Sequence, residues 1–151
     1  MLSAREPGVI AGLDLAEAAF RLVGDGVRFE RRLADGDAVD AGGVVAEISG
    51  PARLVMSAER VALNFLNRLS GIATLTRRYA EAVEGSGARI CDTRKTTPGL
   101  RAFEKYAVRC GGVSAGGGWR HLRAEPCRWR QGRGRWRGGD RIRAGAAGDV
   151  G

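Results

Sequence analysis

The sequence is poor in the residues that mark several common classes of protein. Its 151 residues contain one histidine and three cysteines, Cys91, Cys110 and Cys127. The cysteines are odd in number and lack metal or redox spacing, which argues against a disulfide framework and a zinc site. Their surroundings predict that Cys91 is a small buried residue of a strand and that Cys110 ends a helix, whereas Cys127 falls in an atypical tail.

Long apolar runs are also absent. Met1 is not followed by the cationic and then apolar stretch of a signal peptide, and no segment approaches the ~20 apolar residues of a membrane span. We therefore expect a cytoplasmic protein without a membrane partner.

No lysine precedes Lys95. The first part of the chain has a helical pattern over 16–23, alternation typical of a strand over 27–33, a turn at 34–37 and a second strand over 44–48. Short strands joined by such turns also occur in carrier domains of the lipoyl and biotinyl type. That alternative lacks its decisive feature, because no lysine is available at a hairpin tip.

Positive charge is concentrated in the last part of the chain. Residues 1–110 carry 16 Lys+Arg against 14 Asp+Glu, whereas residues 111–151 carry 9 against 3, so the tail supplies +6 of the net +8. The tail also holds 12 of the 24 glycines and all three tryptophans. This composition is what a GC-rich message yields out of frame, and we hypothesise a frameshift near the codon for Gly112. Resequencing the locus tests this, since an intact frame there would refute it.

A functional Arg/Gly segment that binds RNA is the alternative for this tail. Arginine forks with interleaved aromatic rings can contact phosphates and stack on bases. However, the repeats are irregular, and the tail has neither an RNA-recognition motif nor zinc-knuckle spacing. Composition alone therefore supports a nucleic-acid partner only weakly.

Residues 92–101 crowd three cations, Arg94, Lys95 and Arg101, around a turn. The apolar run before it predicts a strand over 88–91, and Pro98-Gly99 opens a helical pattern. Loops that follow strands are where α/β proteins place their ligands. Arg94 offers a planar fork and Lys95 a mobile point charge, so the loop is a candidate anion site, although a solvated basic loop remains the simpler interpretation.

Residues 57–69 predict a helix with two distinct faces. Arg60, Asn64 and Asn67 share one face. Ser70-Gly71 is expected to interrupt the helix before a second one over 72–83, which 85–87 ends. The opposite face is predicted to form one buried stripe: Ala58, Val61, Ala62, Phe65, Leu66 and Leu69.

Taken together, residues 59–60, 64–74, 92–101 and 104–109 resemble the quinolinate phosphoribosyltransferase family, also called carboxylating nicotinate-nucleotide pyrophosphorylase. The resemblance runs from about 5 to 112 and is densest from 51 onward. It implies an enzyme of NAD synthesis that joins quinolinate to 5-phosphoribosyl 1-diphosphate, using Mg²⁺. Both substrates are strongly anionic, so fixed cations are required to offset their repulsion.

The resemblance also implies roles for individual residues. Thr93, Arg94 and Lys95 match the substrate-binding triplet of the family, and Arg60 matches an arginine that reaches into the active site of a neighbouring subunit. The expected assembly is a homodimer or a higher homo-oligomer. Glu104, Lys105 and Arg109 lie in the matched region but are treated as scaffold, and no catalytic residue is assigned.

Beyond Gly112 the sequence departs from the family. The expected His-Arg pair is missing, and His121 follows Arg120 in the wrong order. The downstream lysine and acidic residues are missing too, so no metal ligand is assigned.

We expect an α/β chain in three parts: a partial N-terminal α+β domain over 1–56, linking helices and the first strand-helix unit of an incomplete α/β barrel over 57–112, and a disordered tail over 113–151. Since a barrel needs about 200 residues or more, we expect a marginally stable, inactive fragment.

Overall fold

The computed structural model describes residues 1–88, 90–93 and 95–113. Arg94, one of the four predicted site residues, lies outside the described residues. The tail over 114–151 lies outside them too, with His121, Cys127 and all three tryptophans, and so does its predicted disorder.

Short antiparallel strands and three helices make up this part. The order is β1 (Leu2–Ser3), β2 (Gly8–Val9), α1 (Leu13–Val23), β3 (Arg28–Arg31), β4 (Ala38–Val39), β5 (Val44–Ser49), α2 (Ala52–Ala82) and α3 (Arg101–Cys110). One sheet has the order β1-β5-β3, and β2 pairs with β4 in a second. The mixed α/β class, the two early strands and the turn at 34–37 are confirmed, and Cys110 ends a helix as predicted.

Helix α2 runs without a break through Ser70-Gly71, so the predicted interruption is wrong. The hydroxyl of Ser70 bonds to a different segment: its Oγ accepts from the backbone N–H of Ala11 at 3.0 Å and donates to the carbonyl of Ala11 at 3.3 Å. One turn later, Thr74 Oγ1 accepts from the N–H of Val9 at 2.9 Å. Serine disfavours helices when its hydroxyl competes for the helix backbone. Here the hydroxyl ties α2 to the segment around β2 instead.

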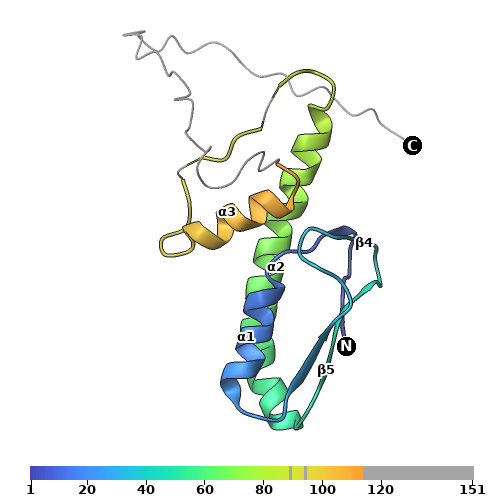
Figure 1. Ribbon diagram of the computed structural model, residues 1–151, viewed down its shortest axis with the longest axis vertical. Helices are drawn as coiled ribbons and strands as arrows, with labels where there is room; N and C mark the ends of the chain where they lie inside the picture. The colour runs from blue at the N-terminus through green and yellow to red at the C-terminus, as the bar shows by residue number, and fades with distance from the viewer. Residues whose placement is uncertain (89, 94, 114–151) are drawn as a thin grey trace, which may run out of the picture. The chain divides into compact units, whose positions relative to one another are not determined.

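One face of α2 supplies residues to all three apolar clusters of the core. Ala58 and Ala62 pack with Ala16 and Phe20 of α1. Further along, the face meets the strands and then α3, and Figure 1 shows α2 as the long helix against which α1 and α3 lie. The later contacts are Leu66 with Ile10, Leu13, Val39 and Val45, and Leu69 and Ala73 with Val9, Ala11 and Ala107.

The predicted buried stripe of α2 is largely confirmed. Ala58, Ala62, Leu66 and Leu69 are at most 6% exposed, but Val61 is 49% exposed and was assigned wrongly. Val61 directly precedes the buried Ala62, so its side chain points about 100° away from that residue around the helix, toward solvent. Arg60, Asn64 and Asn67 lie on the exposed face, as their spacing predicts.

Asp35 connects three parts of the fold. Its Oδ1 accepts from the N–H of Leu13 at 3.0 Å, and its Oδ2 accepts from the hydroxyl of Tyr106 in α3 at 2.8 Å. The N-cap residue of α1 is Gly12, which has no side chain to offer, so a distant carboxylate satisfies that helix end. Burial, and then the hydrogen bond to Asp35, raise the pKa of Tyr106.

Two glycines, one buried and one exposed, give a stability prediction with an internal control. A Cβ at position 111 would lie 2.5 Å from the carbonyl oxygen of Ala73 and 2.6 Å from Cβ of Thr76, whereas a Cβ at position 71 meets nothing within 4 Å. Gly111→Ala should lower the free energy of unfolding by about 1–3 kcal/mol through overpacking. Gly71→Ala should raise it by roughly 0.5–1 kcal/mol, because alanine is the better helix former.

Urea unfolding followed by circular dichroism measures both changes. A Gly111→Ala chain as stable as the unsubstituted one would contradict the packing of 111 on α2. A destabilising Gly71→Ala would contradict the continuous helix.

Candidate anion-binding site

The predicted anion-binding stretch, residues 92–101, lies between the turn after α2 and the first residue of α3, Arg101, and its part 92–97 is called the loop below. The described residues 88, 90 and 91 form no strand, and Cys91 is exposed, so both predictions for this run are wrong. A parallel strand is normally buried between two neighbours. Every strand pair in the described part of the chain is antiparallel and involves residues before 50, so the apolar run has nothing to pair with.

An open cavity of about 450 Å³ adjoins this loop. Its walls come from the second half of α2, the loop itself and one side of α3. Thr93 and Lys95, two of the predicted site residues, line it. The other lining residues are Arg68, Ile72, Leu75, Thr76, Tyr79, Ile90, Cys91, Asp92, Thr96, Thr97, Glu104, Lys105 and Val108.

The carboxylate of Glu104 holds the downstream end of the loop. Glu104 is only 8% exposed. Its Oε2 accepts from the backbone N–H of Thr97 at 3.1 Å, and its Oε1 accepts from Arg68 Nε at 3.2 Å. Arg68 Nη2 also donates to the same carboxylate and to Thr97 Oγ1. The bond to Arg68, followed by that to Thr97, lowers the pKa of Glu104.

A second ion pair holds the upstream end. Lys105, the residue after Glu104 in α3, pairs with Asp92, and the two side chains are 33% and 32% exposed. Between the two held ends, the backbone N–H of Lys95 donates to Thr93 Oγ1 at 3.2 Å. The loop is therefore fixed to α3 on both sides of Thr93 and Lys95.

Among the described residues that line the cavity, one cation is left for a ligand. Arg68 is neutralised by Glu104, and Lys105 by Asp92. Among the residues that the structure describes, Lys95 makes no ion pair and its side chain is exposed. An exposed ammonium beside a cavity attracts an anion without having to leave a partner.

Arg60 is not brought to this cavity. It lies on α2, exposed, eight residues before Arg68, which corresponds to about 12 Å along the helix axis. It is absent from the cavity lining. Its predicted role in a neighbouring subunit stays a prediction, as does that of Arg94.

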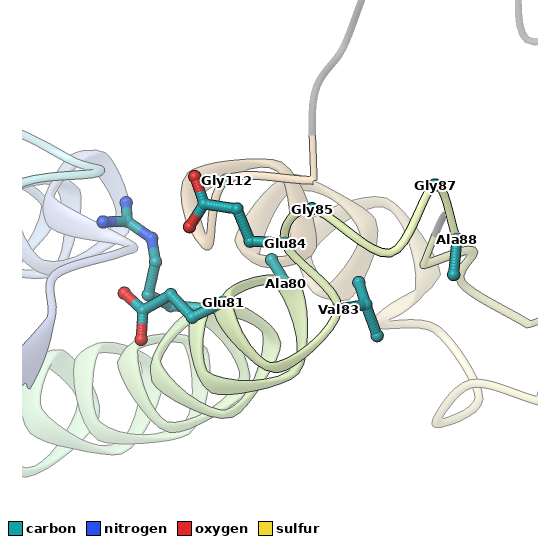
Figure 2. Close-up of a pocket in the computed structure, with 9 residues that line it drawn as sticks. Ala80, Glu81, Val83, Glu84, Gly85, Gly87, Ala88 and Gly112 are labelled. Carbon is teal, nitrogen blue, oxygen red and sulfur yellow. The ribbon is translucent and has the colours of Figure 1, made fainter.

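A second hollow, of about 730 Å³, lies at the other side of the end of α2. Figure 2 shows the side chains of Glu81 and Glu84 at its edge, near Gly112. Arg77, which also lines it, donates from Nε to the carbonyl of Gly111 at 3.0 Å. This hollow does not suit an anion, because two carboxylates line it and its arginine already donates to the backbone. None of the predicted site residues lines it.

Two other kinds of site were sought in the described residues. No group of three or more His, Cys, Asp or Glu side chains lies close enough together there to hold a metal ion. Across those same residues, no helix has both the length and the apolar character needed to cross a membrane.

Comparison with known proteins identifies the family. The model for "Quinolinate phosphoribosyl transferase, N-terminal domain" matches residues 1–70, and that for the C-terminal domain matches residues 72–121. The chain belongs to the quinolinate phosphoribosyltransferase family. The second match runs to residue 121. It therefore extends past Gly112, the predicted end of the resemblance.

Individual relatives agree with this family. The chain is 47% identical over 118 residues to the probable nicotinate-nucleotide pyrophosphorylase [carboxylating] of Bacillus subtilis, covering 78% of this chain and 39% of the relative. Its identity to the Synechocystis protein of the same name is 50% over 110 residues, 73% of this chain and 37% of that one. The crystal structure of NadC from Streptococcus pyogenes matches with a TM-score of 0.70 and 49% identity, over 73% and 39% of the two chains. The chain thus spans about two fifths of these relatives.

Sequence reasoning missed the network that holds the loop. Sequence patterns predict no role in the site for Arg68, and they indicate only a scaffold role for Glu104 and Lys105. Spacing within one helix could not reveal a bond between residues 36 apart in the chain. The available signal was the acid-base pair Glu104-Lys105 at the start of a helix that directly follows a cation-rich loop.

The lowered pKa of Glu104 predicts a pH-dependent contribution to stability. An ordinary carboxyl of this kind titrates near 4.5, and the folded one titrates lower because Arg68 and Thr97 favour the charged form. The contribution is therefore present above about pH 4.5 and is lost as the pH falls through the folded pKa. The gap in free energy of unfolding between the unsubstituted chain and Glu104→Gln should accordingly narrow on acidification.

Urea unfolding at several values from about pH 7 down to about pH 3 checks this. Glu81→Gln, which removes an exposed carboxylate from the other hollow, is the control and should show a small gap throughout. If the difference in free energy of unfolding between Glu104→Gln and the unsubstituted chain stayed constant over this pH range, the stabilising role assigned to the charged Glu104 carboxylate would be contradicted.

Proposed function

We propose that residues 1–112 form part of a carboxylating quinolinate phosphoribosyltransferase. The reaction joins quinolinate to 5-phosphoribosyl 1-diphosphate and yields nicotinate mononucleotide, diphosphate and CO₂. The observation that carries the proposal is the match of both family models, in order, along 120 of the 151 residues. Relatives named nicotinate-nucleotide pyrophosphorylase [carboxylating] point to the same chemistry.

The charge arrangement around the loop supports an anionic substrate. A pyridine with two carboxylates and a phosphorylated sugar repel each other unless fixed cations offset the charge. In the proposal, Lys95 supplies one such cation, Thr93 a hydroxyl beside it, and Arg94 a planar fork for a carboxylate or phosphate. Cations held in place before the reaction also stabilise the negative charge that collects on the departing diphosphate.

Arg60 completes the proposed site from a second copy of the protein. Its exposed position on α2, away from the cavity of its own chain, is compatible with service in a partner subunit. The proposal therefore includes a homodimer or a higher homo-oligomer in the cytoplasm.

Magnesium is expected from the family, but the described residues do not fit a protein-held site. They bring no three acidic, histidine or cysteine side chains together. Mg²⁺ in such enzymes is commonly bound through one or two carboxylates and substrate phosphates. The proposal accordingly assigns no magnesium ligand to this chain and routes no step through the ion.

The proposed activity belongs to a protein of the relatives' length. This chain covers 39% of the Bacillus subtilis relative, so about three fifths of that protein has no counterpart in it. Pocket residues act as a unit, and we propose that the 151-residue chain alone does not complete the reaction. The matches give no support to the RNA-binding alternative for the tail.

A chimera tests the function. Residues 1–112 of this chain would replace the matching part of the Bacillus subtilis relative, and formation of nicotinate mononucleotide from quinolinate and 5-phosphoribosyl 1-diphosphate would be measured. We expect an active chimera. Arg60→Gln and Lys95→Gln should each lower kcat/KM by roughly ten- to a hundredfold, the equivalent of one charge-assisted hydrogen bond.

Arg53→Gln is the matched control for Arg60, since Arg53 is an exposed arginine in the first turn of the same helix. It should leave kcat/KM nearly unchanged. A folded chimera without turnover, or full activity in both the Arg60 and Lys95 variants, would refute the proposed function.

A further inference from the structure

The loop that carries Thr93 and Lys95 is held at its two ends by two consecutive residues of one helix. Glu104 binds Thr97 at the downstream end, and Lys105 binds Asp92 at the upstream end. Successive residues of a helix point in directions about 100° apart, so neighbouring side chains can reach two separate points of a crossing segment. One turn of α3 thus sets the separation of the loop's ends.

The first of these contacts is reinforced from α2. Arg68 donates to the same carboxylate that receives the N–H of Thr97, and also to the hydroxyl of Thr97. The buried Glu104 therefore joins three elements: α2, α3 and the loop. A carboxylate that is 8% exposed and bonded on both oxygens is poorly accessible to a ligand, and its charge would repel an anion.

We propose that Glu104 and Lys105 are positioning residues, which fix where Thr93 and Lys95 face the cavity and do not themselves contact the substrate. The reason differs for Lys105: its ammonium is already paired with Asp92, so an anion would have to compete with that carboxylate. This inference rests on the proposed function and adds a role for two residues outside its set of binding residues. Misplacing a binding group by a fraction of its contact distance weakens binding even when the group itself is unchanged.

Binding of quinolinate to the 151-residue chain tests the inference. Affinity would be measured by nuclear magnetic resonance titration, and the amide exchange of Lys95 and Thr97 would be measured in the same samples. Glu104→Gln and Lys105→Gln should each weaken the affinity by at least about fivefold, because the side chains that bind are no longer held in place. The exchange at Thr97 should become faster in Glu104→Gln, which loses the charged acceptor of that N–H.

Two controls remove the same charges elsewhere. Glu81→Gln loses an exposed carboxylate at the end of α2, and Arg53→Gln loses an exposed cation in the first turn of the same helix, outside the cavity lining. Both should keep the affinity of the unsubstituted chain within about twofold, so an effect of net charge alone is separated from an effect of position. Circular dichroism confirms that each variant is folded. If Glu104→Gln does not fold, Lys105→Gln, which breaks a more exposed pair, carries the test.

The possible results are distinct. Unchanged affinity in the folded Glu104 and Lys105 variants would overturn the inference, even if their thermal stability falls, since that is the behaviour of residues that only support the fold. Equal losses in the variants and the controls would overturn it too. If the unsubstituted chain binds no quinolinate, the proposed binding role of the loop fails. In that case amide exchange still tests whether Glu104 and Lys105 hold the loop in place. Faster exchange in both variants, but in neither control, would support this hold, and unchanged exchange would refute it.

Discussion

The close contact of α2 with its neighbours through alanine side chains is the constraint on which the rest of this structure depends. Ala58, Ala62 and Ala73 are at most 1% exposed, and each lies where another element crosses the helix. Small side chains let backbones approach, and dense packing then leaves little freedom for what lies above them. Gly111 shows the same tightness at the far end of α3. This face of α2 determines the position of α3. It therefore also determines the position of the loop that α3 holds.

Much of the fold could be predicted because local sequence patterns determine it. Alternation gave the two longer strands, the turn at 34–37 followed from its Asp-Gly residues, and steps of three and four gave most of the buried face of α2. The failures have a common cause. Ser70-Gly71 reads as a break only if the serine hydroxyl is assumed to stay local, and the apolar run before Asp92 reads as a strand only if neighbours exist to pair with it. Both depend on parts of the molecule that a local pattern does not contain.

The candidate site divides in the same way. Its cations could be found from composition and from resemblance, and the structure places Thr93 and Lys95 on one cavity. The partners that neutralise the neighbouring charges could not be found, because Arg68 and Glu104 are far apart in the chain and each resembles an ordinary surface residue of an amphipathic helix. Knowing which charges cancel distinguishes Lys95 from Arg68 and Lys105, the other described cations that line the cavity. That information exists only in the packed structure.

Two of the bonds that fix α3, and through it the loop, join residues far apart along the chain, with separations of 36 for Arg68 to Glu104 and 71 for Asp35 to Tyr106. Contacts of this kind require large loops to close, which is entropically costly and slow compared with local helix formation. A synthetic peptide spanning residues 88–97 would contain the cations but none of the distant partners that arrange them. The proposed binding of an anion by this segment therefore requires that α2, the turn at Asp35 and α3 have already come together, which is a late step of folding.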